Sequence, residues 1–414
     1  MYRWYLLLLV AFAVSTCGFV DKVLNRPSWS GSNQSVFQTY ATRICVVEFA
    51  NGSQQNLACD RLELFIDAES TACQRYSSKP VRAHFPDQLR TMNLCRASSG
   101  KDYSQANSIR FLVFGDVGSG QEASYGHQQL RVSQAMQSVC FSDNKEGCDF
   151  ALITGDLIYP NGVDDVWSKD FNTRFESMYR EFKTPFRFFV VPGNHDYKGN
   201  AKAQVEYSLF SNLWSMPDTH YAIKNLPDWL SIYAADSTLI KESSSSYSQQ
   251  LREAAAALCS KQGWRVIFAH HPPMSNGNHG GDPTMLRFVS DLSAQCDIHF
   301  VFGGHDHHQE HIQTDSFDVI VQGAGGYKTR DVHNVHGLSL TASTPGKSYN
   351  YRQLFAKKAH GFAAVKMDSE KVDIWFYDIQ KWPYGLLSYK TPPSQNDSIY
   401  HCRSTLESPR CQSL

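Results

Sequence analysis

The sequence predicts an α/β protein in which helices cover two sheets, arranged as a four-layer α/β/β/α sandwich. Two observations carry this prediction. From residue 109 onward, apolar and β-rich runs alternate with stretches of helical character. Each early run also ends in a short polar cluster, most of which contain glycine. Runs of this length that alternate with helices are typical of βα units, whose helices pack on the face of a sheet.

The expected elements follow from these runs. Five first strands are predicted at Arg110–Phe114, Phe150–Thr154, Phe186–Val191, Arg265–Ala269 and Ile298–Phe302. Helices are predicted at Gln128–Val139, Val166–Phe182, Gln249–Ser260 and Thr284–Ala294. Four later strands could complete a second sheet, at Trp229–Ala235, Val319–Gln322, Gly361–Met367 and Val372–Tyr377. The serine-rich segment Ser243–Ser248 is expected to be an exposed loop.

The composition excludes some classes of function. A chain of 414 residues can hold one large α/β domain and a further module. Its content of 42% hydrophobic and 13% aromatic residues argues against disorder. The formal net charge of -1 provides no general basic field, so no nucleic-acid partner is expected.

The first 18 residues have the pattern of an export signal. Arg3 precedes the apolar run Leu6–Val14, which is short for a membrane span, and small residues surround Cys17. We therefore expect a secreted protein, or one in the lumen of the secretory or lysosomal pathway. A bacterial source would instead imply a periplasmic or lipid-anchored protein. An uncleaved anchor is the alternative, and no later apolar segment indicates a transmembrane anchor.

The cysteines indicate an oxidising compartment. Ten remain when Cys17 is set aside, and behind an export signal they are expected to form disulfides. The favoured local pairs are Cys140–Cys148 and Cys402–Cys411, followed by Cys259–Cys296. Glycosylation sequons lie at Asn33, Asn51 and Asn396.

Each of the five early strands is followed by residues of the kind that bind metals. These clusters are Gly115-Asp116-Val117-Gly118, Gly155-Asp156-Leu157-Ile158-Tyr159, Gly193-Asn194-His195-Asp196, His270-His271-Pro272 and Gly304-His305-Asp306-His307. In open α/β sheets the loops after the strands converge on one crevice. Carboxylate, amide, phenol and imidazole groups are ligands for transition metals, and two ions need a bridging carboxylate. A single cluster of this kind is usually a turn or a helix cap, but five in order predict a binuclear metal site.

The five blocks resemble those of the purple acid phosphatases, within the calcineurin-like metallophosphoesterase superfamily, over roughly residues 109–380. Most of that superfamily has Asp-x-His in the first block, where this chain has Asp116-Val117-Gly118. In the purple subgroup a tyrosine three residues after the second aspartate supplies the missing ligand, and Tyr159 matches it. The chain is similar to the small, tartrate-resistant branch at Ala203–Ser208, Trp214–Pro217 and Gly323–Gly326.

The resemblance implies the roles of the seven ligands. Asp116, Tyr159 and His307 would bind a ferric ion, and a tyrosinate on ferric iron gives the colour of the family. Asn194, His270 and His305 would bind a divalent ion of iron, zinc or manganese, and Asp156 would bridge the two. His305 and His307 alternate along an extended segment, so both can face the metals only if Asp306 turns away.

The same resemblance implies hydrolysis of phosphate monoesters, on small molecules or phosphoproteins, by a metal-bound hydroxide at acidic pH. His195 would contact phosphate, and His279 would protonate the leaving oxygen. His271 is a third catalytic candidate, at a position where the branch commonly has tyrosine. Asn278 replaces a common glutamate, which leaves the identity of the proton donor open.

The domain boundaries follow from these assignments. Residues 1–18 are the predicted signal peptide, and 19–107 form a disulfide-rich N-terminal accessory module that could bind an unknown partner. Residues 108–385 form the metallophosphatase domain, and 386–414 form a C-terminal tail with a local disulfide. The loop at Ser243–Ser248 lies where the small branch carries a repressive loop that is cleaved. A phosphodiesterase on the same fold, or a binding or anchoring protein, are the alternative functions.

Overall fold

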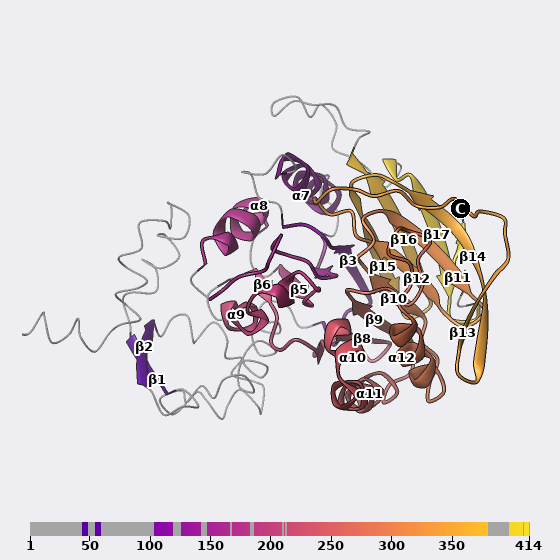
Figure 1. Cartoon of the computed structure of the whole chain (residues 1–414), viewed down its shortest axis with the longest axis horizontal. Helices are drawn as coiled ribbons and strands as arrows, with labels where there is room; N and C mark the ends of the chain where they lie inside the picture. Colours follow the sequence, from indigo (N-terminus) through magenta and orange to yellow (C-terminus); the bar gives the residue numbers. More distant parts are fainter. Residues whose placement is uncertain are drawn as a thin grey trace, which may run out of the picture.

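The computed structural model contains two large mixed sheets and a separate short hairpin (Figure 1). It describes residues 44–48, 54–58, 103–118, 126–141, 147–165, 168–182, 186–208, 211, 213–379, 397–408 and 410–413. The hairpin pairs β1 (Ile44–Glu48) with β2 (Gln54–Ala58). The predicted signal peptide and the sequons lie outside the described residues, as does most of the accessory module.

The first sheet has the strand order β18-β17-β16-β15-β3-β4-β5-β6. Its parallel half consists of β3 (Ser108–Phe114), β4 (Phe150–Ile153), β5 (Arg187–Val190) and β6 (Trp214–Ser215). Its antiparallel half consists of β15 (Gly361–Asp368), β16 (Lys371–Asp378), β17 (Tyr400–Thr405) and β18 (Gln412–Ser413). The segment near the C-terminus therefore extends the same sheet.

The second sheet has the order β13-β14-β11-β12-β10-β9-β8-β7. Four strands run parallel to one another, namely β8 (Leu230–Ala235), β9 (Trp264–Ala269), β10 (Phe300–Gly303) and β12 (Asp318–Gln322). The other four pair antiparallel with their neighbours, namely β7 (Tyr221–Ala222), β11 (Gln309–Thr314), β13 (Leu340–Thr344) and β14 (Lys347–Lys357).

Helices cover the outer face of each sheet. The first sheet packs against α7 (Gly126–Phe141), the π-helical turn η1 (Asn172–Glu176), α8 (Ser177–Tyr179) and α9 (Ala201–Tyr207). The second sheet packs against α10 (Ser237–Glu242), α11 (Ser244–Leu258) and α12 (Pro283–Ser293). A third apolar cluster, in which Phe111 contacts Phe302, fills the space between the sheets. The order of layers is therefore helix, sheet, sheet, helix.

All nine expected strands form, but their division between the sheets differs from the prediction. The first sheet contains β3, β4 and β5, which are among the five strands predicted first, and β15 and β16, which are among the four later ones. The second contains β9 and β10 from the first five, with β8 and β12 from the later four. Long-range pairing decides this division, since β15 pairs with β3 across about half of the chain. Periodicity along the sequence carries no information about that partner.

One loop prediction and one helix prediction need correction. Ser243–Ser248 is not a loop, because Ser243 caps α11 and its hydroxyl accepts a hydrogen bond from the Ser246 amide (3.2 Å). A serine run offers caps, and the residues after it then bury Gln250, Ala254 and Leu258 at helical spacing. The helix predicted at Val166–Phe182 forms over a shorter length, as η1 and α8.

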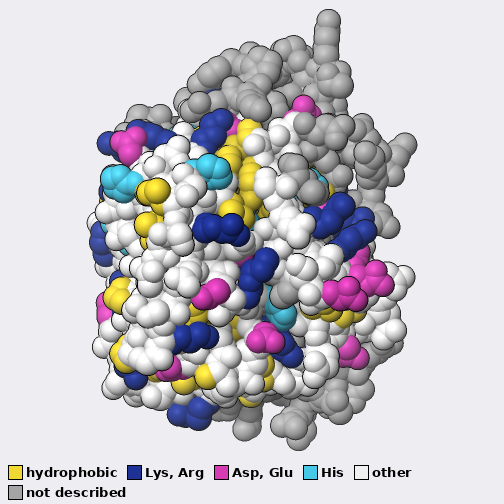
Figure 2. All heavy atoms as spheres, turned by 90° about the vertical axis from the view of Figure 1, so that its right-hand side faces the viewer, with side chains coloured by type: hydrophobic (Ala, Val, Ile, Leu, Met, Phe, Trp, Pro, Cys, Tyr) yellow, Lys and Arg dark blue, Asp and Glu magenta, His cyan; other side chains and the backbone are white. Residues whose placement is uncertain are grey.

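The three favoured disulfides are confirmed as Cys140–Cys148, Cys259–Cys296 and Cys402–Cys411. They indicate an extracytoplasmic location. The sequence predicts a disulfide-rich module at residues 19–107. All three disulfides of the described residues lie outside that range, so they are not N-terminal. Within the described part of the chain, no helix is long and apolar enough to cross a membrane. On the face in Figure 2, basic and acidic side chains are interspersed.

Candidate metal centre

The loops after the parallel strands bring the seven expected ligands together. Asp116 follows β3, Asp156 and Tyr159 follow β4, and Asn194 follows β5, all in the first sheet. His270 follows β9, and His305 and His307 follow β10, in the second sheet. A hydrogen bond joins the two sheets at this end: His270, after β9, donates to the carbonyl of Thr154, after β4. The site therefore lies where the carboxyl ends of both sets of strands meet.

A first group of ligand atoms surrounds the Tyr159 oxygen. This oxygen lies 2.9 Å from Asp116 Oδ1, 2.9 Å from Asp156 Oδ2 and 3.1 Å from His307 Nε2. His307 Nε2 also lies 3.2 Å from Asp116 Oδ1. All four residues are buried. The three ligands expected for the ferric ion and the expected bridging carboxylate are thus gathered around the Tyr159 oxygen.

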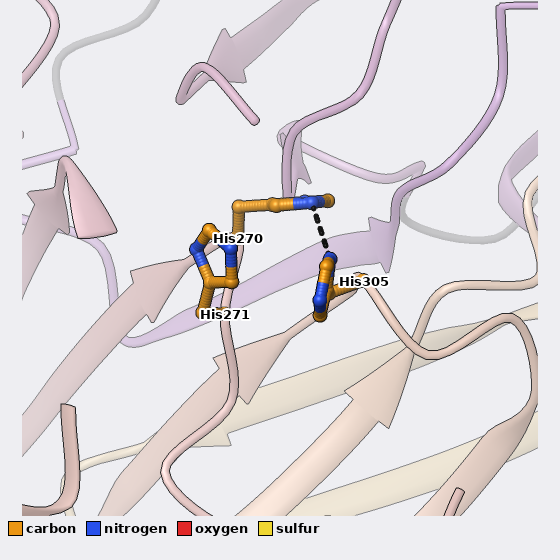
Figure 3. A group of neighbouring side chains, drawn as sticks. All are labelled: His270, His271 and His305. Atoms are coloured by element: carbon orange, nitrogen blue, oxygen red, sulfur yellow. Dashed lines mark hydrogen bonds between the residues drawn. The ribbon is translucent and has the colours of Figure 1, made fainter. Parts of the chain in front are cut away.

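A second group of ligand atoms surrounds His270 Nε2. This nitrogen lies 3.1 Å from Asn194 Oδ1 and 3.1 Å from His305 Nδ1, and the dashed line in Figure 3 marks the contact between the two imidazoles. Asp156 Oδ2 is 3.5 Å from the same nitrogen. Asp156 Oδ2 therefore belongs to both groups, as a bridging ligand must.

The hydrogen bonds around the cluster fit cations. His270 Nδ1 lies 2.9 Å from the Thr154 carbonyl oxygen, and His307 Nδ1 lies 2.7 Å from that of Lys328. A carbonyl can only accept, so each Nδ1 carries a proton, and in the neutral imidazole each Nε2 then directs a lone pair into the site. His270 Nε2 then faces the Asn194 amide oxygen, which is also an acceptor. A cation between these acceptors resolves the repulsion, and the His and Asp groups suit a binuclear metal site.

The backbone is strained at the ligands. Asp116, Asp156 and His305 have φ values of 55°, 50° and 67°, in the left-handed region that side chains disfavour. Asn225 is the one other non-glycine residue with positive φ in the described part of the chain. Such strain is concentrated at functional sites, because the surrounding structure must impose it.

Asp196 holds together two of the turns that carry ligands, and the sequence pattern predicted no role for it. Its buried carboxylate accepts hydrogen bonds from the amides of Gly193 (2.8 Å) and Leu157 (3.2 Å) and from Gln204 Nε2 (2.9 Å). It thereby ties the turn before Asn194 to the turn after Asp156. Burial, followed by the nearby Asp156 charge, raises the pKa of Asp196 to about 7. The sequence signal that could have identified Asp196 is its position in the Gly193-Asn194-His195-Asp196 cluster.

The three catalytic candidates lie around this cluster. His195 is partly exposed, and its ring centroid is 4.5 Å from that of Tyr159. His279 is exposed, with its ring centroid 4.4 Å from that of His305. His271 is buried at the same distance from His305, and its Nδ1 is 2.8 Å from Ser237 Oγ. Burial, followed by the charge of His270, lowers the pKa of His271 to about 2, which keeps this imidazole neutral.

Comparison with known proteins agrees with this geometry. Residues 109–309 match the family model of calcineurin-like phosphoesterases. Tartrate-resistant acid phosphatase type 5 from Homo sapiens is 25% identical over 296 residues, which cover 66% of this chain and 87% of that protein. Purple acid phosphatase 3 from Arabidopsis thaliana is 24% identical over 325 residues, covering 71% and 80%.

A solved structure supports the fold. Purple acid phosphatase PPD1 from yellow lupin (Lupinus luteus) seeds superposes with a TM-score of 0.51 at 14% identity, covering 69% of this chain and 54% of that one. The residues matched by the family model include all seven expected ligands. Over residues 109–309 the chain therefore belongs to the calcineurin-like metallophosphoesterases, and it is a distant relative of the tartrate-resistant and purple acid phosphatases.

Proposed function

We propose that this chain is an acid phosphatase that hydrolyses phosphate monoesters at a binuclear centre. Asp116, Tyr159 and His307 would hold a ferric ion, and Asp156 would bridge to the second ion. The ligands of that second ion, divalent iron, zinc or manganese, would be Asn194, His270 and His305. The observation that carries the proposal is the Tyr159 oxygen, which lies within 2.9 Å of both carboxylates.

The packing at Gly118 supports the same assignment. A Cβ atom at residue 118 would lie 1.5 Å from the Leu157 carbonyl oxygen, so a side chain at this position cannot be accommodated. The first block therefore has no room for the histidine of the common Asp-x-His pattern. Tyr159, whose amide bonds to the Gly118 carbonyl (3.2 Å), brings a phenol to the site instead. This exchange distinguishes the purple members of the superfamily.

The roles of the side chains follow from their positions. Two bound cations would hold phosphoryl oxygens and lower the pKa of water so that a nucleophile forms at acidic pH. His195, beside Tyr159, would donate a hydrogen bond to a phosphate oxygen. His279, beside His305, would deliver a proton to the departing alkoxide. His271 packs against His305 and fixes its orientation from the buried side.

Turnover of matched substrates tests the proposed activity. The purified protein is expected to hydrolyse p-nitrophenyl phosphate at acidic pH with a much higher kcat/KM than bis(p-nitrophenyl) phosphate. A preference for the diester would identify a phosphodiesterase and overturn the proposal. Turnover of neither ester by metal-loaded protein would favour a binding or anchoring role for the fold.

Removing the phenol tests the ferric assignment. Tyr159→Phe keeps the ring stacked on Tyr327, at a centroid distance of 3.8 Å, but deletes the ligand oxygen. We expect the visible absorption of the wild-type protein to disappear. The loss in kcat/KM should be at least the roughly 10–100-fold typical of removing a residue that only supports a metal ligand. Visible spectra with iron analysis measure this, and Tyr327→Phe is the matched control that should keep its colour. A colourless, iron-free wild type or a coloured Tyr159→Phe would contradict the assignment.

A further inference from the structure

A buried carboxylate lies beneath the loop that carries His279. Asp306 stands between the ligands His305 and His307, and its side chain turns away from them and is fully buried, as the alternation of the segment requires. It accepts hydrogen bonds from the amides of His279 (2.9 Å) and Gly280 (3.1 Å) and from Ser275 Oγ (2.7 Å). The far side of the ligand segment thus holds the loop of residues 275–280.

A second buried carboxylate, Glu310 on β11, holds the start of the same loop. Its oxygens accept hydrogen bonds from Asn276 Nδ2 (2.7 Å) and from the Asn276 amide (3.0 Å). They also accept from His308 Nε2 (3.0 Å) and Gln353 Nε2 (2.6 Å). Burial acts to raise the pKa of Glu310, but the hydrogen bond with His308 and its charge, together with the hydrogen bonds from Gln353 and Asn276, outweigh burial and lower this pKa. Hydrogen bonds to an ionised carboxylate are stronger than those between neutral groups, so Glu310 holds its donors firmly in place.

The loop lies directly on these residues. A Cβ atom at Gly277 would be 2.5 Å from Asp306 Cγ and 2.5 Å from His308 Cε1, so only glycine permits this approach. The loop therefore has little room to shift toward the ligand segment.

The network continues into a second loop beside the site. Gln353 on β14 donates to Glu310 and to the His333 carbonyl (2.9 Å), and its Oε1 accepts from the Val335 amide (2.8 Å). The His333 amide in turn donates to the Asn276 carbonyl (2.9 Å). Glu310 is therefore the point at which two neighbouring loops are tied to one strand.

We propose that Glu310 is a positioning residue which, through Asn276 and Gln353, fixes the His279 loop over the metal centre. Within the described part of the chain, Glu310 makes no hydrogen bond to any of the seven expected ligands, so its effect passes through His279, whose ring lies against His305. The inference rests on the proposed function in one respect, the role of His279 as proton donor to the leaving group.

Glu310→Gln tests this with little change in volume, because it places an amide donor against the donors of Asn276 and Gln353. A positioned proton donor matters most for poor leaving groups. With phenyl phosphate, kcat/KM is expected to fall about tenfold or more, and with p-nitrophenyl phosphate by less than about threefold. Asn276→Ala, which removes one donor from a partly buried residue, should produce the same asymmetry to a smaller extent.

Matched variants separate positioning from general destabilisation. Asp373→Asn alters another buried carboxylate, paired with His401 (2.8 Å) and Arg403 (2.7 Å), and should leave the ratio of the two substrates unchanged. In a His279→Ala background, Glu310→Gln should cause no further loss specific to phenyl phosphate. Equal losses with both substrates, or an additional specific loss in that background, would overturn the inference.

Amide hydrogen exchange provides a readout that does not depend on activity. Glu310→Gln should speed exchange at the amides of Asn276, His279 and Gly280, whereas Asp373→Asn should not. Unchanged exchange in this loop would refute the positioning role. If the wild-type protein hydrolyses no phosphomonoester, the proposed function fails, and the exchange measurement still decides the role of Glu310.

Discussion

Asp156→Asn is expected to remove metal and turnover together. Asp156 Oδ2 is the one atom shared by both ligand groups, at 2.9 Å from the Tyr159 oxygen and 3.5 Å from His270 Nε2. An asparagine in the same rotamer either turns its amide nitrogen toward the cations or loses the bond from the His195 amide to Oδ1 (2.8 Å). Bridged cations supply several kcal/mol of transition-state stabilisation, so kcat/KM should fall about 10³-fold or more.

Metal analysis of purified protein, combined with turnover of p-nitrophenyl phosphate, measures this loss. Asp373→Asn serves as the control for altering a buried carboxylate, and it should keep both metals. His305→Ala removes a ligand of the second group only, and it should also lower metal content and turnover together. A variant at Asp156 or His305 that retained its full metal content and turnover would refute the ligand assignment.

The ligands could be predicted from the sequence because each directly follows an apolar strand. Asp116, Asp156 and Asn194 stand two to four residues after strands whose ends are clear from their hydrophobic runs. Parallel strands place those positions at one edge whatever the details of packing. The sequence predicted two sheets but not which strands belong to each. That assignment leaves the outcome unchanged, because both sheets present the carboxyl ends of their parallel strands at the same edge.

The supporting residues could not be predicted in the same way. Glu310 acts through Asn276 and Gln353, which are 34 and 43 positions away in the sequence. Asp196 is near a ligand in sequence, but its function depends on the amide of Leu157, 39 residues earlier. Such contacts arise from the tertiary arrangement and have no periodic signal. The same holds for α11, where a serine run typical of loops forms the N-cap and the first turn of a helix that buries Ala254 and Leu258.

Gly193→Ala is expected to disable the centre although it adds only one methyl group. A Cβ atom at residue 193 would lie 2.1 Å from Asp156 Oδ1 and 2.5 Å from the Asp156 amide nitrogen. The bridging carboxylate must therefore move, and a displacement near 1 Å at a catalytic group costs about 100-fold in rate. Overpacking at a buried site should also lower the free energy of unfolding by about 1–3 kcal/mol.

Gly337→Ala separates the two effects. Gly337 has a φ of 85°, so alanine there is strained, but its Cβ would meet no atom within 4 Å. This control should lose about 1 kcal/mol of stability without loss of metal or turnover. Metal content, kcat/KM and denaturant unfolding of both variants distinguish a displaced ligand from a weakened fold. If Gly193→Ala kept wild-type turnover, the close approach of the turn at residue 193 to Asp156 would have no part in holding the bridging ligand.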